Sequence, residues 1–79
     1  MAAVHPGEVL LSEVIVPANL SLRAVAERLD CEPDLLAEFV RGRLPVTLEL
    51  AAALAREFGH RRERWIALQL AWDREQRIA

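Results

Sequence analysis

The sequence predicts an all-α domain of five helices that is built around a helix-turn-helix. Apolar residues recur at three- and four-residue spacing along most of the 79 residues, and no segment carries a strand signal. Residues that typically begin and end helices divide this pattern into five stretches. Apolar residues make up 53% of the chain, which is enough for one core at this length. We therefore expect residues 1–79 to form a single domain.

The first helix is expected to begin in the His-Pro-Gly-Glu segment at residues 5–8 and to end at Pro17. Pro6 suits the first turn because its missing N–H would have no partner there. Glu8 lies where a carboxylate meets the positive end of the helix dipole. The apolar side of this helix is expected to consist of Val9, Leu10, Leu11, Val14 and Ile15.

Residues 21–42 are predicted to form the helix-turn-helix, as two short helices joined by a tight turn. Ser21 is the expected N-cap of the first of these helices. Asp30 lies in the turn, where Asp tolerates the left-handed conformation better than most residues. Pro33 suits the first position of the second helix, and Gly42 suits its end. The expected apolar faces are Leu22, Val25, Ala26 and Leu29 on the first helix and Leu35, Leu36, Phe39 and Val40 on the second.

Two further helices are predicted after an extended connector at residues 43–46. Thr47 is the expected N-cap of the fourth helix, and Gly59 is its expected end. The fifth helix is expected to run from about Glu63 to Arg77, with apolar groups on two sides, which indicates contact with more than its own core. The fourth helix is expected to bury Leu50, Ala51, Leu54, Ala55 and Phe58; the fifth carries Trp65, Leu68 and Trp72 on one side and Ile66 and Leu70 on another.

Composition and motif content favour a binding protein of the cytoplasm over an enzyme. The single cysteine, Cys31, excludes an internal disulfide and fits a reducing compartment. No apolar run approaches the ~18 residues of a membrane span, and the N-terminus lacks the pattern of a signal peptide. His5 and His60 have no neighbouring ligands at metal spacing, and no nucleophile–base pair or phosphate loop is present. We therefore expect no enzymatic activity, cofactor, metal or membrane association.

The two ends of the chain carry motifs that occur together in one family. Residues 5–21 read HPGEVLLSEVIVPANLS, and residues 65–73 follow the pattern Trp-x-x-Leu-Gln-x-Ala-aromatic-Asp. Between them lie Arg-Gly-Arg at residues 41–43, Val-Thr at residues 46–47 and Phe-Gly at residues 58–59. From about His5 to Glu75 the chain resembles HigA-type antitoxins of the Xre-like helix-turn-helix family. Either end motif alone would be weak, but the combination is fairly specific.

The resemblance implies a lambda-repressor-like fold that usually forms a homodimer. It implies a cognate HigB-type toxin, a small RelE-like ribonuclease that cuts mRNA on the ribosome, as the partner. It also implies autorepression through a palindromic operator. The DNA-contacting positions would be Ser21, Arg23, Pro33, Asp34, Ala37, Glu38, Arg41 and Arg43. Toxin or dimer contacts would fall on Trp65, Ile66, Gln69, Leu70, Trp72 and Asp73, with core packing as the other interpretation for the two tryptophans.

The recognition helix departs from the pattern of this family, which usually reads Val-Ser-Arg-x-x-Leu-Ser-Arg here. Residues 31–38 instead read Cys-Glu-Pro-Asp-Leu-Leu-Ala-Glu. Residues 30–38 contain four acids and no base, and residues 20–45 contain four arginines against five acids. Non-specific affinity for DNA comes almost wholly from basic groups at phosphates. We therefore expect DNA binding to be weak or lost.

Three functions follow from these observations. The leading one is a HigA-like antitoxin that binds and neutralises a basic toxin, since opposite charges speed encounter and orient the pair. The second is a dimeric helix-turn-helix scaffold or interaction module that has lost DNA binding. The third is a repressor that reads an unusual operator through Arg23, Arg41 and Arg43.

Overall fold

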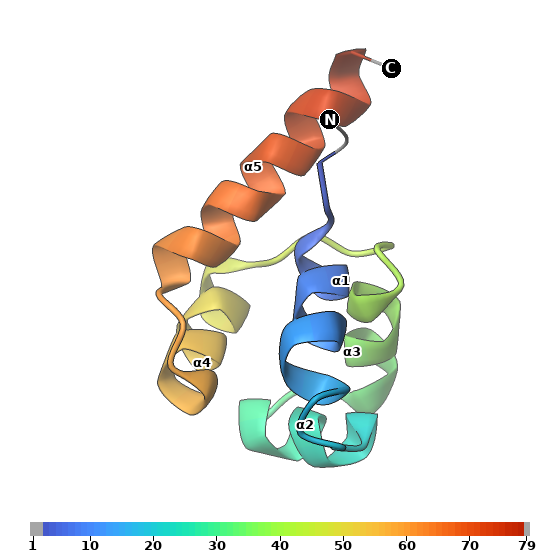
Figure 1. The fold of residues 1–79 in the computed structure, drawn as a ribbon, viewed down its shortest axis with the longest axis vertical. Helices are drawn as coiled ribbons and strands as arrows, with labels where there is room; N and C mark the ends of the chain where they lie inside the picture. Colours follow the sequence, from blue (N-terminus) through green and yellow to red (C-terminus); the bar gives the residue numbers. More distant parts are fainter. Residues whose placement is uncertain (1–2, 79) are drawn as a thin grey trace.

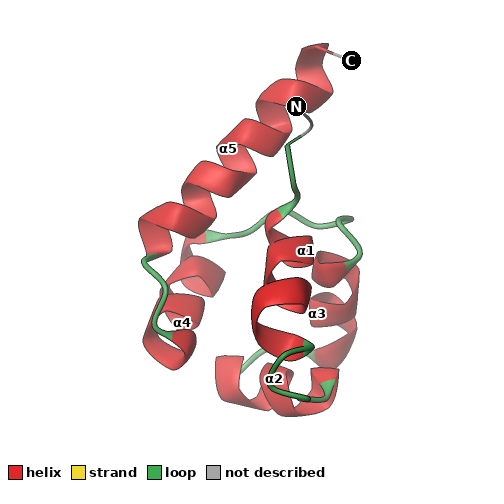
Figure 2. Ribbon diagram, in the orientation of Figure 1, coloured by secondary structure: helices red, strands yellow, loops and turns green. Residues whose placement is uncertain are grey.

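The computed structural model describes residues 3–78, and helices occupy most of this range (Figure 1). The elements are α1 (Pro6–Leu10), its π-helical continuation η1 (Leu11–Ile15), α2 (Leu22–Leu29), α3 (Pro33–Val40), α4 (Leu48–Phe58) and α5 (Arg62–Ile78). Residues 3–78 contain only helices and loops (Figure 2). The predicted all-α class with five helices is therefore confirmed.

The helices pack as a bundle in which α3 lies beside both α1 and α2. Helix α4 contacts α2 and α5, and α5, the longest helix, runs back past the N-terminal segment to reach α1 (Figure 1). Arg64 of α5 donates to both carboxylate oxygens of Glu13 in η1 at 3.0 Å, which ties the first turn of α5 to η1. The core consists of Val9, Leu10, Ile15, Val25, Ala26, Leu29, Leu36, Phe39, Ala51, Ala53, Leu54 and Trp65.

The helix starts are set by the residues that the sequence indicated. The Ser21 hydroxyl accepts from the Ala24 N–H at 3.0 Å, and the Thr47 hydroxyl accepts from the Leu50 N–H at the same distance. Each hydroxyl satisfies a backbone donor that has no partner within the helix. Pro33 occupies the first turn of α3, as predicted.

The helix ends are set by left-handed residues. Asp30 after α2 has φ 56°, and Gly42 and Gly59 after α3 and α4 have φ 79° and 78°. The Cys31 N–H reaches back to the Ala26 carbonyl at 3.0 Å, which is the six-to-one bond of a Schellman turn. These three predicted ends are confirmed, and the turn between α2 and α3 is held tightly.

Two details of the predicted packing are wrong. Leu35, assigned to the buried face of α3, is 54% exposed, because Leu36 and Phe39 alone turn fully inward. Ala53 is buried although the predicted stripe of α4 omitted it. The first helix stops just before Pro17, as predicted, but its second half widens into a π-helix that ends at Ile15.

Candidate nucleic-acid and partner interface

The His-Pro-Gly-Glu motif sets the position of the recognition helix. The Nδ1 atom of buried His5 accepts from the Gly7 N–H at 2.9 Å and so caps α1. The His5 ring makes edge contacts with Phe39 of α3 at 5.6 Å and with Trp72 of α5 at 5.3 Å between centroids. A Cβ on Gly7 would lie 1.8 Å from the Phe39 carbonyl oxygen, so only glycine lets α1 approach α3 this closely. The motif is structural, and it holds α3 against α1 and α5.

Burial favours the neutral form of His5. Desolvation lowers the pKa of His5 below the ordinary value of 6.5, against the opposing effects of a backbone hydrogen bond with Leu44 and the charges of Asp73 and Glu8. A neutral ring is also what the cap needs, because Nδ1 must carry a lone pair to accept from Gly7.

The exposed face of α3 is acidic where the family pattern is basic. Pro33 and Asp34 are exposed, Ala37 and Glu38 are half-buried, and Glu32 before them is exposed and makes no capping hydrogen bond with its side chain. Asp34 lies in the first turn, where a carboxylate is favoured by the helix dipole. Glu32 and Asp34 therefore face solvent, and the position of Asp34 is explained by its favourable interaction with the dipole of α3.

The arginines flanking the helix-turn-helix are only partly available to phosphates. Arg23 and Arg41 are exposed. Arg43 lies 3.4 Å from Glu38, so its charge is partly neutralised by the acidic face itself. Arg28 turns away, donates to the Glu57 carbonyl at 3.2 Å and covers the ring of Phe58. Ser21 is exposed and engaged as a cap, and with Arg23, Arg41 and Arg43 it stays a predicted DNA contact, whereas Arg28 is not one.

Two residues predicted to face a partner lie in the chain's own core. Trp65 is 0% exposed, and Gln69 is 7% exposed. Gln69 accepts from the Val46 N–H at 2.8 Å through its side-chain oxygen and donates to Asp73 at 2.9 Å. It thereby fixes the connector before α4 onto α5. Trp65 therefore packs in the core, the other interpretation given above, and neither Trp65 nor Gln69 is exposed enough to contact a partner.

Of the other predicted partner contacts on α5, only Leu70 is well exposed. Leu70 is 55% exposed, whereas Ile66, Trp72 and Asp73 are half-buried. Trp72 packs on the ring of His5, and Asp73 receives the bond from Gln69. Leu70 is therefore the residue of this set that is best placed to contact a partner.

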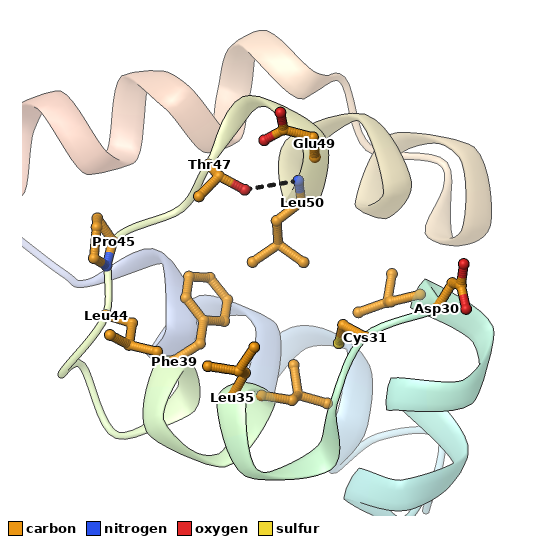
Figure 3. Close-up of a pocket in the computed structure, with 11 residues that line it drawn as sticks. Asp30, Cys31, Leu35, Phe39, Leu44, Pro45, Thr47, Glu49 and Leu50 are labelled. Atoms are coloured by element: carbon orange, nitrogen blue, oxygen red, sulfur yellow. Dashed lines mark hydrogen bonds between the residues drawn. The ribbon is translucent and has the colours of Figure 1, made fainter.

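An apolar groove lies between α3 and α4, beside the start of the recognition helix (Figure 3). It has a volume of about 310 Å³. It is lined by Leu29, Cys31, Leu35, Leu36, Phe39, Leu44, Pro45 and Leu50, together with the polar residues Asp30, Thr47 and Glu49. Sequence reasoning missed this α3–α4 groove, although two adjacent leucines in α3 already exceeded what one buried face needs.

Cys31 is half-buried, and desolvation raises the pKa of its thiol, with the charges of Asp30 and Glu32 adding to the effect. Within the described part of the chain, His, Cys, Asp and Glu residues form no group of three that could hold a metal ion. Among the helices of residues 3–78, none combines the length and the apolar character needed to cross a membrane.

Comparisons with known proteins agree with the fold and with the motifs. No protein-family model matches the chain. Virulence-associated protein I of Dichelobacter nodosus is 38% identical over 73 residues, which cover 92% of this chain and 68% of that protein. The chain thus spans about two thirds of the length of this relative.

Solved structures of antitoxins superpose closely on the whole bundle. An addiction module antidote protein of the HigA family from Coxiella burnetii has a TM-score of 0.89 and 30% identity, with 96% of this chain and 83% of that chain covered. Antitoxin HigA of Pseudomonas aeruginosa, solved with the higBA promoter, has a TM-score of 0.89 and 26% identity, covering 94% and 80%. The end motifs, the helix-turn-helix and these likenesses lead to one conclusion: the chain belongs to the HigA family of helix-turn-helix antitoxins.

Proposed function

We propose that the protein is the antitoxin of a type II toxin–antitoxin module and neutralises a basic RelE-like ribonuclease of the HigB type by direct binding. Membership of the HigA family supports an antitoxin role. The observation that carries the rest is the acidic, exposed start of α3, where Glu32 and Asp34 face solvent. Such a surface attracts a basic protein and repels a phosphate backbone. The working form is a homodimer that acts by binding and needs no cofactor.

Repression of its own operon is the second candidate function. It is favoured by the Pseudomonas aeruginosa antitoxin that was solved with its promoter. In this chain the operator would have to be held through Arg23 and Arg41, since Arg43 is paired with Glu38. Two free arginines per subunit supply few phosphate contacts, so we propose that operator binding is the weaker of the two activities.

Co-expression with the small protein encoded by the adjacent open reading frame tests the antitoxin function. We expect that protein to arrest growth when produced alone, growth to recover when this chain is produced with it, and the two to co-purify in a fixed ratio. Recovery of growth without co-purification, or co-purification without recovery, would contradict neutralisation by direct binding. If neither occurs, the chain is not the antitoxin of that protein, and a scaffold role becomes the better explanation.

A further inference from the structure

The α3–α4 groove borders α3, the helix that carries half of the predicted DNA-contacting residues. Leu35 lines it from the first turns of α3, one residue after the exposed Asp34. Leu50 and Thr47 line it from the start of α4, and Phe39 is among its buried lining residues (Figure 3). Leu35 is 54% exposed and continuous with the apolar lining of the groove, and a contiguous apolar patch of this kind marks an interaction site.

The groove continues past Cys31 into a second, more open hollow. The two share Asp30, Cys31 and Leu35, and the second one is also lined by Glu27 and Glu32. With Glu49 at the other side, four exposed carboxylates lie along the combined length. Among the described residues that line either hollow, none is basic. The surface is therefore an apolar floor with a negative rim.

We propose that this combined groove is the docking site for an amphipathic, positively charged segment of a protein partner. Apolar side chains of that segment would cover Leu35 and Leu50, and its arginines or lysines would lie opposite Asp30, Glu32 and Glu49. The recognition mode is that of an apolar face laid into a hydrophobic groove and oriented by charge at the edges. The inference rests on the proposed function, since the partner that we assign to the groove is the basic toxin.

Two other occupants fit the groove less well. A second copy of this chain related by a two-fold axis would place the same acidic rim opposite itself, which costs free energy. DNA would bring phosphates to the same carboxylates. A docked basic segment would lie against Glu32 and Leu35 at the start of α3, so toxin binding would compete with operator binding through α3.

A pair of substitutions at exposed apolar residues tests the inference. Leu35 in the groove is 54% exposed, and Val16, in the turn after η1 and outside both hollows, is 66% exposed, so the free protein has room for a glutamate at either position. Leu35→Glu adds a carboxylate that would be buried against the apolar part of the docked segment. We expect Leu35→Glu to weaken binding to the purified toxin at least tenfold in a calorimetric titration, about 1.4 kcal/mol, and Val16→Glu to leave it within about twofold. Melting curves followed by circular dichroism would show that both variants fold.

The titration, together with sedimentation and operator-binding measurements on the same variants, separates the possible outcomes. If the wild-type protein binds the toxin and the two variants bind equally well, the groove inference is overturned while the antitoxin function stands. If the wild-type protein does not bind, the antitoxin function fails, and the toxin assigned to the groove fails with it. If Leu35→Glu instead converts a dimer to a monomer in sedimentation, the groove is an interface between copies of this chain. If it abolishes operator binding alone, DNA is the occupant.

Cys31 supplies a second readout that needs no substitution. It is the only cysteine in the chain, it is half-buried, and it lines both hollows. A partner seated in the groove must shield its thiol. We expect bound toxin to slow the reaction of Cys31 with a thiol reagent, measured at alkaline pH because burial raises the pKa of this thiol, by at least tenfold. An unchanged rate in the saturated complex would contradict the inference.

Discussion

At Gly7, the backbones of α1 and α3 approach so closely that a Cβ would not fit between them. The missing side chain of Gly7 lets the helix backbones touch, with the Phe39 carbonyl where a Cβ would be. Glycine ordinarily weakens a helix relative to alanine, so its presence inside α1 needs a packing reason, and this contact is the reason. The His-Pro-Gly-Glu motif thus determines where the recognition helix lies.

Gly7→Ala is expected to destabilise the protein, contrary to the usual effect of adding alanine to a helix. The new Cβ must push α1 away from backbone atoms of α3, which cannot move aside as a flexible side chain could. We expect the free energy of unfolding in urea to fall by about 2–3 kcal/mol. Gly59→Ala is the control: it has open space and only the strain of φ 78°, so about 1 kcal/mol should be lost. Equal losses would show that the close approach is not tight.

His5 should make stability depend on pH. Its pKa is lowered in the folded state, so between the folded and unfolded pKa values the unfolded chain binds more protons. The contribution of His5 to the free energy of unfolding is therefore fully present above about pH 6.5. It declines as the pH falls below that value, and the decline levels off once the histidine of the folded protein is itself protonated. His5→Asn retains a capping side chain but does not titrate there. Urea unfolding of both proteins between pH 8 and pH 5 should show a steeper decline for the wild type; parallel curves would contradict this.

At the scale of the elements, the sequence was informative wherever structure is decided by neighbouring residues. Ser21 and Thr47 cap their helices, and Asp30, Gly42 and Gly59 end theirs, because each acts on backbone groups within four residues. The exposed face of α3 was harder to predict. Its apolar residues span more than one side of the helix, and only the positions of α1 and α4 determine which of them is left outside.

In the candidate site, too, features set by neighbouring residues could be predicted and features set by packing between elements could not. The acidic character of α3 was evident from residues 30–38, and the structure places those acids at the surface. The α3–α4 groove could not be predicted, because it combines α3 with the start of α4 across a connector whose course has no local signal. The burial of Gln69 was missed for a related reason: its partner, the Val46 N–H, is 23 residues away.

Gln69→Ala tests the connection between the connector and α5. The substitution removes the acceptor of the Val46 N–H and leaves that partly buried donor without its partner. We expect the free energy of unfolding to fall by about 2 kcal/mol. Gln76→Ala, at an exposed position of the same helix, should change it by no more than about 0.5 kcal/mol. Similar effects of the two substitutions would contradict the structural role of Gln69.

At the scale of the whole molecule, the bundle is the scaffold of a DNA-binding regulator with an altered surface. The net charge is −2, and the acids concentrate at the part of the helix-turn-helix that would enter a major groove. The same region carries an apolar groove with an exposed leucine. The combination suits a basic protein better than a nucleic acid.

Fluorescence anisotropy with the DNA upstream of the gene, at ~150 mM salt, tests most directly whether the acidic surface of α3 has lost specific DNA binding. We predict that the wild-type protein binds only in the non-specific range of ~10⁻⁴–10⁻⁶ M, because exposed acids repel phosphates. The variant with both Asp34→Asn and Glu38→Gln should bind more tightly, since it removes two carboxylates and frees Arg43. Sub-micromolar, sequence-specific binding by the wild-type protein, unchanged in the double variant, would contradict the account.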